Sequence, residues 1–437
     1  MIRKSMNNAQ QSHSQSSPDR LRPWLIPAVY AVVAIAFGLT FPQIESQIFP
    51  GLVSKMSVGD ATTIYSAIAS GMIAMTGIVF SLAFVMVQFS ASSYSPRLVL
   101  WIARDPALSH ALGVFTATFL YALSALTGVD RDRSGNVPVI SVWVVFLLLL
   151  ASVAMFIKLI QLIGRLQVNQ ILVFTGDQGR EVIATAYPLK ESEAKAKESV
   201  DLGGMTCTQT LIYKGKPRSL QVVNVNGLLS LAASSGGIIE LAVAVGDTVV
   251  ELMPVLRVLG ARQPVDERRL WNEIEIGDER TFEQDPKYAI RLLVDIAIRA
   301  LSPAVNDPTT AVQALDQIED LLTRLGQRDL DIGAYRDEKG DLRLVVPFPA
   351  WEDLVRLALD EICFCGATSV QVMRRMNALL GDLIPHVPEE RRRVLRHWQG
   401  RVRSTITRTF VNEEEKAEAL QEDRQGIGVP HLNLQRP

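Results

Sequence analysis

The amino-acid sequence predicts a mainly α-helical integral membrane protein, with four transmembrane helices followed by an α+β cytoplasmic domain. The first observation behind this prediction is that the N-terminal third holds four stretches of 18 or more residues without Asp, Glu, Lys or Arg. A helix needs about 20 mostly apolar residues to cross a bilayer. The second observation is that charged residues interrupt the apolar ones throughout the rest of the chain, as in a soluble protein.

The four uncharged stretches are residues 24–41, 61–96, 106–129 and 134–157. They predict a transmembrane domain over residues 24–163. Residues 1–23 precede it and are rich in Gln, Ser and Asn, a composition that cannot bury a core, so we expect a disordered cytoplasmic tail there. Since no small-x-small cleavage site follows the first stretch, we interpret that stretch as a retained helix and not as a removed signal peptide.

Lysine and arginine near the ends of the stretches predict the orientation, because the cytoplasmic flanks of membrane helices carry more of them. The tail, the second connection and the segment after the fourth stretch carry Arg3, Lys4, Arg20, Arg22, Arg97, Arg104, Lys158, Arg165 and Arg180. The two opposite connections carry only Lys55, Arg131 and Arg133. Both termini, and the domain after residue 163, are therefore expected in the cytoplasm.

Small and weakly polar residues recur along the second stretch at spacings of three, four and seven, which places them on one helical face. They are Thr63, Ser66, Ser70, Ala74, Gly77, Ser81 and Gln88. One interpretation is close packing against another helix. The other is that copies of this helix surround an axis and line a water-filled path. The cores of the four stretches contain no ionisable side chain, which disfavours a proton-driven carrier or a voltage sensor.

Two modules are expected after the membrane domain. Residues 164–265 form a β-rich module, with strands predicted at residues 208–213, 219–224, 237–245 and 248–256. Gly246-Asp247 suits a tight hairpin turn between the last two strands. Residues 266–423 are expected to form a helical module, because their apolar residues recur at helical spacing. Within it, residues 342–346 are expected to be one strand of a hairpin that turns at Glu338-Lys339-Gly340. Residues 424–437 are expected to be a flexible tail.

A polar run in the helical module has two interpretations. In the first, Asp295 and Arg299 pair along one helix, and Asn306 and Asp307 cap the next helix, which Pro308 begins. In the second, six polar side chains converge between helices as a ligand pocket. These are Arg280, Asp285, Asp295, Arg299, Asn306 and Asp307.

This run also carries a family resemblance. Residues 295–311 read DIAIRALSPAVNDPTTA, and Arg280-Thr281 and Gln284-Asp285-Pro286 precede them. Together with residues 93–97, 116–123 and 349–353, they resemble the domain-of-unknown-function 2254 family of predicted bacterial membrane proteins. The resemblance covers nearly the whole chain apart from its tails. It implies a multi-pass protein of the bacterial inner membrane, and it brings no known activity, ligand or catalytic residue.

Catalytic and cofactor motifs are missing from the sequence. There is no GxxxxGK[ST] loop, and there is no convincing GxGxxG, HExxH, GxSxG or CxxC motif. The three cysteines, Cys207, Cys363 and Cys365, form neither a disulfide framework nor a zinc pattern. We therefore expect no enzymatic activity, no cofactor and no metal. The net charge of -2 gives no support for a nucleic-acid partner.

Two classes of function follow from these observations. The leading hypothesis is a homo-oligomeric channel-like or transport-associated protein that its cytoplasmic domain gates. The alternative is a membrane-anchored ligand sensor or scaffold without transport activity. In both cases the lipid bilayer is an expected partner.

Overall fold

A computed structural model of the chain describes residues 25–48, 56–93, 106–127, 137–164, 168–190, 202 and 204–428. The chain forms two compact units, Met1–Gln167 and Val168–Pro437.

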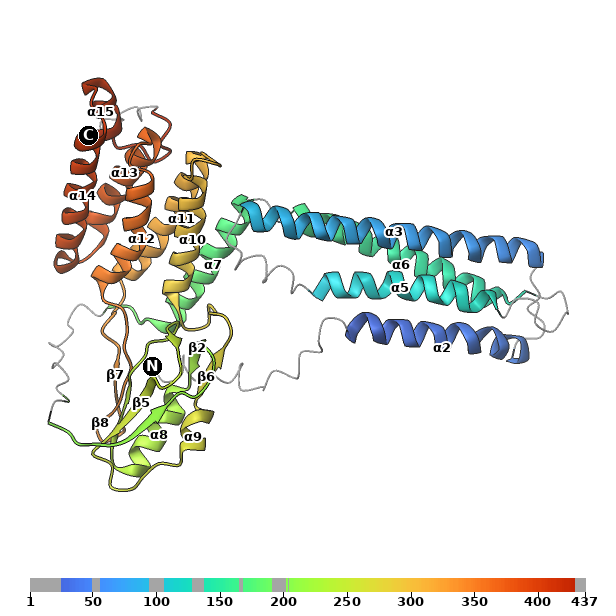
Figure 1. Ribbon diagram of the computed structural model, residues 1–437, viewed down its shortest axis with the longest axis horizontal. Coiled ribbons are helices and arrows are strands. Elements are labelled where there is room, and N and C mark those ends of the chain that lie inside the picture. Colours follow the sequence, from blue (N-terminus) through green and yellow to red (C-terminus); the bar gives the residue numbers. More distant parts are fainter. Residues whose placement is uncertain are drawn as a thin grey trace. The chain divides into compact units, whose positions relative to one another are not determined.

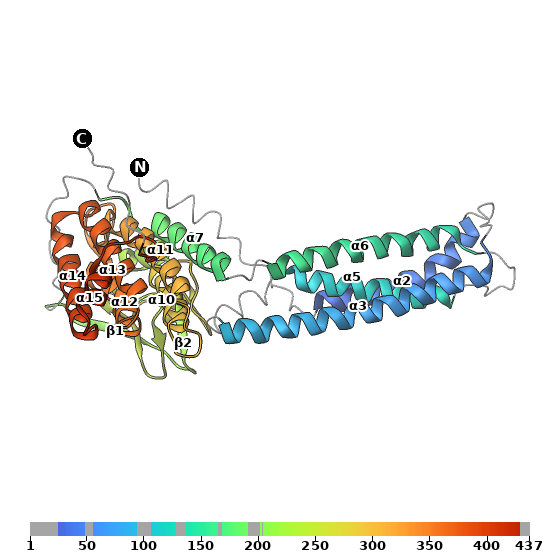
Figure 2. The ribbon, with the colours of Figure 1, turned by 90° about the horizontal axis from the view of Figure 1, so that it is seen from above.

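The described residues of unit 1 form four helices, α2 (Leu25–Ile48), α3 (Val58–Ser93), α5 (Pro106–Leu126) and α6 (Val139–Gly164). All four are long and apolar enough to cross a membrane, which confirms the predicted number of spans. Helix α5 packs against each of the other three, and it is the most buried of the four. Figures 1 and 2 show it running alongside them within this unit.

Glycine allows α2 and α5 to approach closely. A Cβ on Gly38 would lie 2.7 Å from the Cβ of Ser124, and a Cβ on Gly113 would lie 2.9 Å from the ring of Tyr30. Small residues at such contacts strengthen helix association in lipid, where the hydrophobic effect gives little help.

Unit 2 begins with α7 (Val168–Ala186) and continues with a β-rich segment. The elements of this segment are β1 (Cys207–Ile212), β2 (Arg218–Val223), α8 (Val225–Ser235), β3 (Ile238–Leu241), β4 (Thr248–Val249), β5 (Pro254–Leu259), α9 (Glu267–Asn272) and β6 (Ile274–Gly277). The remaining elements are α10 (Pro286–Ala300), α11 (Pro308–Gly326), β7 (Ala334–Arg336), β8 (Leu342–Val345), α12 (Trp351–Cys365), α13 (Val370–His386), α14 (Glu389–Thr409) and α15 (Glu413–Leu420).

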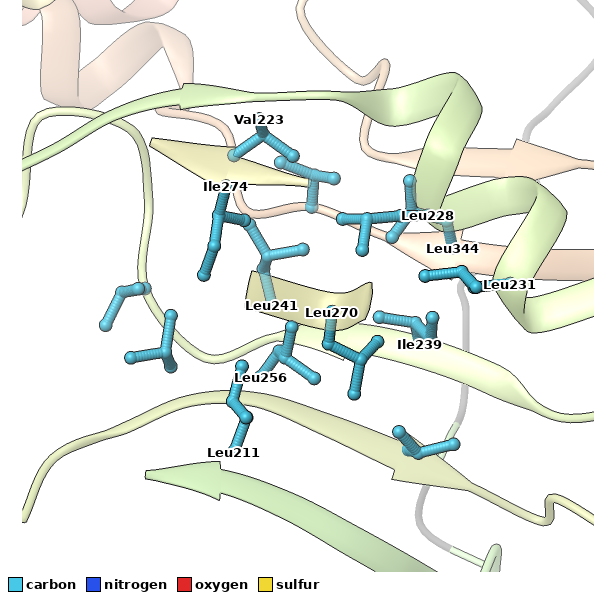
Figure 3. Close-up of a cluster of buried hydrophobic side chains, with 14 of the residues drawn as sticks. Leu211, Val223, Leu228, Leu231, Ile239, Leu241, Leu256, Leu270, Ile274 and Leu344 are labelled. Atoms are coloured by element: carbon cyan, nitrogen blue, oxygen red, sulfur yellow. The ribbon is translucent and has the colours of Figure 1, made fainter. Parts of the chain in front are cut away.

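The strands form two sheets. The larger has the order β1-β5-β3-β8-β7, with β3 and β8 parallel and the other neighbours antiparallel, and the smaller has the order β4-β2-β6. Their apolar faces share one core. Figure 3 shows Leu228 and Leu231 of α8 lying near Ile239, Leu256 and Leu344 of the larger sheet.

The structure corrects the predicted hairpin at Gly246-Asp247. Strand β3 ends at Leu241 and pairs with β5 and β8, whereas β4 pairs with β2 in the other sheet. The amide of Gly246 donates to the carbonyl of Leu220 (2.8 Å), and the amide of Leu220 donates to the carbonyl of Asp247 (3.0 Å). The segment therefore carries the chain from one sheet to the other.

The two predicted modules are interleaved in the structure. Strands β6, β7 and β8 come from the segment that was expected to be mainly helical, and β8 pairs with β3. The hairpin strand predicted there at residues 342–346 is confirmed as β8, which pairs with β7. Conversely, α7 comes from the segment that was expected to be β-rich, yet it packs on α10 and α11. A Cβ on Gly179 of α7 would lie 2.8 Å from Leu321 and 3.0 Å from Ala289, so this packing is close.

Candidate functional site

A buried carboxylate joins two helices of unit 1. Glu45 of α2 is only 4% exposed, and its oxygens accept hydrogen bonds from the amides of Ile140 (2.6 Å) and Ser141 (2.9 Å). These amides belong to the first turn of α6, which has no intrahelical partners for them and carries a partial positive charge. Glu45 is therefore an N-cap for α6 supplied by another helix.

The other two helices of unit 1 meet at the same place. The hydroxyl of Tyr65 on α3 donates to the hydroxyl of Ser141 (3.2 Å), and Tyr121 on α5 bonds to the same hydroxyl (2.9 Å). Sequence reasoning missed this cluster. The predicted span ended at residue 41, but α2 continues through Pro42 and brings Glu45 to the end of the span.

The small-residue face of α3, defined as Thr63, Ser66, Ser70, Gly77 and Ser81, is exposed along its whole length. The opposite face holds Tyr65, Ala69 and Met72, which are buried against the other helices. A Cβ on Gly77 would meet no atom of the described chain within 4 Å. The sixth predicted member, Gln88, lies in the backbone range of α3, but its side chain is outside the described residues.

A buried ion pair lies in unit 2, at the start of α10. Arg280 donates to Oδ2 of Asp285 through Nε (3.0 Å) and Nη2 (2.5 Å), and Asp285 is 1% exposed. Desolvation by burial raises the pKa of the Asp285 carboxyl, although Arg280 and Lys287 lower it. The burial effect is larger because a carboxylate without water needs several good hydrogen bonds to remain charged.

Three buried polar atoms near this ion pair have no hydrogen-bond partner among the described residues. They are Oδ1 of Asp285, Oγ1 of Thr281 and the hydroxyl of Tyr187. Burial and the charge of Asp285 raise the pKa of Tyr187. Because buried polar groups are almost always satisfied in native proteins, such atoms point to a bound water or ligand.

An open cleft of about 510 Å³ lies beside the ion pair. It is lined by Ala244, Asp247, Lys287, Pro347, Phe348, Pro349, Asp353, Arg356, Leu357, Asp360 and Glu361. Gly246, next to Asp247, contacts Asp285 so closely that a Cβ would overlap the carboxylate. The ring of Phe348 packs edge-on against Tyr187, with 5.8 Å between ring centroids.

Four carboxylates and two cations line the cleft. Each of its four carboxylates has an ion-pair partner: Asp247 with Lys287 (3.6 Å), Asp353 with Arg356 (2.8 Å), Asp360 with Arg401 (2.5 Å) and Glu361 with Arg291. Arg401 and Arg291 are not among the residues that line the cleft, so the lining itself has two more carboxylates than cations.

The six polar residues predicted as a pocket are not brought to one place. Arg280 and Asp285 lie at the start of α10, whereas Asn306 and Asp307 lie beyond its end. At about 1.5 Å per residue, these ends are roughly 22 Å apart. Asp295 lies between them and pairs with Arg291 at 2.6 Å. Arg299 lies in the last turn of α10.

The predicted cap of α11 is present. Asp307 accepts hydrogen bonds from the amide (3.1 Å) and hydroxyl (2.6 Å) of Thr310. Asn306 before it has a φ of 48°, in the left-handed region that Asn adopts more readily than most residues. The turn and the helix cap therefore account for Asn306 and Asp307.

Among the described residues, no group of three or more His, Cys, Asp or Glu side chains is arranged to hold a metal ion.

Comparison with known proteins gives a family and distant relatives. The family model described as predicted membrane protein (DUF2254) matches residues 20–382. The uncharacterized proteins Mb1321c of Mycobacterium bovis and Rv1290c of Mycobacterium tuberculosis are each 27% identical over 417 residues, which is 91% of this chain and 78% of theirs. No solved structure matches. The family match covers most of the chain, so this protein belongs to the DUF2254 family of predicted membrane proteins.

Proposed function

We propose that the protein forms a homo-oligomer through the small-residue face of α3, and that this assembly is a channel-like pathway gated by unit 2. In the proposal the protein lies in a bacterial inner membrane with both termini in the cytoplasm, and it has no catalytic role. The observation that carries the proposal is that the small-residue face is exposed while the opposite face of the same helix is buried.

The exposed small residues of α3 suit contact with a second helix better than contact with lipid. Large apolar residues such as Ile78 and Phe80 are exposed elsewhere on α3, together with small residues such as Gly71. Small residues offer lipid tails little contact, but they let a second helix approach closely. Thr63 donates its hydroxyl to the carbonyl of Gly59 (2.8 Å), so this side chain is already satisfied within its own helix. Close approach, and not hydrogen bonding, is therefore the expected source of association there.

Ion flux through proteoliposomes tests the channel. We expect measurable flux from the wild-type protein, and a loss of tenfold or more, to the order of magnitude, when Ser70, Gly77 or Ser81 is changed to Leu, because a larger side chain prevents close approach or fills the path. Ile78→Leu is the matched control, since it changes an exposed apolar residue outside the face. Absence of flux from wild-type oligomers, or equal flux from all variants, would contradict the proposal.

A second candidate function is the ligand sensor, which the cleft and the orphaned atoms of Asp285 and Tyr187 favour. A small molecule that donates a hydrogen bond to Oδ1 of Asp285 would satisfy that buried acceptor. We expect thermal unfolding of the full-length protein in detergent to shift upward with one member of a panel of small amines and alcohols. The shift should disappear in Asp285→Asn and persist in Asp295→Asn. A panel that produces no shift would count against the sensor.

A further inference from the structure

Two neighbouring connections in unit 2 present large apolar side chains to solvent. Ile212 at the end of β1 is 42% exposed, and Val250 and Leu252, between β4 and β5, are 44% and 73% exposed. We name these three residues the apolar tip. They come together because the amide of Leu252 donates to the carbonyl of Tyr213 (3.0 Å), while the amide of Tyr213 donates to the carbonyl of Met253 (2.9 Å).

The most exposed of them, Leu252, is held in an unfavourable conformation. Val250 and Met253 close a β-turn through a hydrogen bond of 3.0 Å, and Leu252, its third residue, has a φ of 68°. A type II turn needs a positive φ at this position and usually has Gly there, because a Cβ is strained in the left-handed region. Strained residues persist mainly where function requires them. Leu252 thus places a large apolar side chain at a turn position where Gly would be less strained.

Basic side chains flank the apolar tip. Lys214 is exposed, and Lys216 is 72% exposed and 3.8 Å from Asp278, which also pairs with Arg218. The carboxylate of Glu251 accepts a hydrogen bond from the amide of Gly215 (2.6 Å). Among the described residues, Lys214 has no carboxylate within ion-pair distance. The formal charge of these five side chains is one positive unit, from three cations and two carboxylates.

We propose that the apolar tip docks on an anionic lipid surface, with Leu252 at the level of the headgroups and the two lysines beside the phosphates. Apolar side chains flanked by lysines are the chemistry that binds membrane interfaces. The tip consists of two turns and not of a groove, so it suits a deformable surface better than a complementary protein pocket. The chain carries its own membrane spans, which keep such a surface at high effective concentration.

A lipid-borne quencher tests this docking in the full-length protein. The background carries Cys207→Ser, Cys363→Ala and Cys365→Ser, and an environment-sensitive fluorophore is attached at Leu252→Cys. The protein is reconstituted in phosphatidylcholine vesicles that contain phosphatidylserine and a nitroxide-labelled lipid. A fluorophore at Val411→Cys is the control, because Val411 is 90% exposed in another part of unit 2. We expect quenching at 252 to exceed that at 411 by about twofold or more.

Two further variants separate lipid contact from folding. Lys214→Glu combined with Lys216→Glu should reduce the quenching at 252, and so should vesicles of phosphatidylcholine alone. Leu252→Gly, read by a fluorophore at Val250→Cys, should raise the unfolding temperature in detergent and lower the quenching in vesicles. A merely structural Leu252 would not move these two measurements in opposite directions.

Two results would overturn the proposal. One is equal quenching at 252 and 411 in anionic vesicles. The other is an immobilised fluorophore at 252 that the lipid-borne quencher does not reach, which would show that a protein covers the tip. Neither result bears on ion flux, so the docking proposal can be contradicted without contradicting the channel proposal.

Discussion

Glu45 and Asp285 are both almost fully buried carboxylates, but they differ in the hydrogen bonds that their oxygens accept. Both oxygens of Glu45 accept amides at the positive end of α6. Oδ2 of Asp285 accepts two hydrogen bonds from Arg280, whereas Oδ1 has no partner among the described residues. The first arrangement satisfies a charge within the membrane unit, whereas the second leaves an acceptor unsatisfied beside the cleft. Buried acids of the second kind are common at functional sites.

Removal of the Glu45 carboxylate should destabilise unit 1. Glu45→Ala leaves the amides of Ile140 and Ser141 without acceptors, and the loss of an N-cap costs roughly 1–2 kcal/mol. Glu45→Gln keeps one acceptor oxygen and should lose less. Unfolding of the purified protein in mixed detergent micelles measures both. Equal stability of Glu45→Ala and the wild type would show that α6 does not need this cap.

The Asp285 carboxyl should make stability fall as pH rises. Its pKa is raised above the ordinary value of 3.8, so the folded state holds the proton over a pH range in which the unfolded chain has lost it. Its favourable contribution is therefore complete below the ordinary pKa, and it is lost as pH rises through the raised pKa.

Comparison with Asp285→Asn isolates this contribution, because the other titrating groups are shared. Glu319, whose pKa is also raised by burial, and Asp320, whose pKa Arg324 and Arg180 lower, then cancel in the difference. Thermal unfolding at several pH values between about 4 and 7 measures it. The stability of the wild type relative to Asp285→Asn should decrease with pH. A constant or increasing difference would mean that Arg280 outweighs the effect of burial.

At the scale of elements, helix ends position the polar residues of unit 2. Asp285 precedes α10, and Asp307 caps α11. The turn between these two helices contains Asn306 in a left-handed conformation. Part of the run at residues 295–311 that carries the family resemblance is therefore explained by the need to end one helix and start the next within a few residues.

Neighbouring substitutions in this turn should have opposite effects. Asp307→Ala removes the cap of α11 and should cost about 1 kcal/mol. Asn306→Gly places the residue that tolerates a positive φ best, so it should be neutral or stabilising by a few tenths of a kcal/mol, roughly. Thermal unfolding of the full-length variants distinguishes them. A destabilising Asn306→Gly would show that the Asn306 side chain, and not only its backbone, holds the turn.

At the scale of the whole molecule, local patterns predicted the membrane spans and distant pairing could not be predicted. The number of spans follows from apolar length, which is a local property. Strand β8 pairs with β3 although α10 and α11 lie between them in sequence, and no spacing rule anticipates such a contact. The role of Glu45 was not predicted because α2 extends beyond the uncharged residues that were used to define the span.

The small-residue face of α3 was predicted from spacing alone, but its exposure required the structure. Helical periodicity says which residues share a face, and only packing says which face the other helices cover. Here α5 covers the side of Tyr65 and Met72. The other side is left for lipid or a second copy.

Disulfide cross-linking in native membranes tests most directly whether a second copy covers that side. Gly77→Cys and Ile78→Cys are compared in the background without the three native cysteines. These neighbours are both exposed, but they point about 100° apart around the helix. A homo-oligomer built on the small-residue face predicts a disulfide-linked dimer for Gly77→Cys and little or none for Ile78→Cys. Equal cross-linking at both positions, or none at position 77, would contradict it.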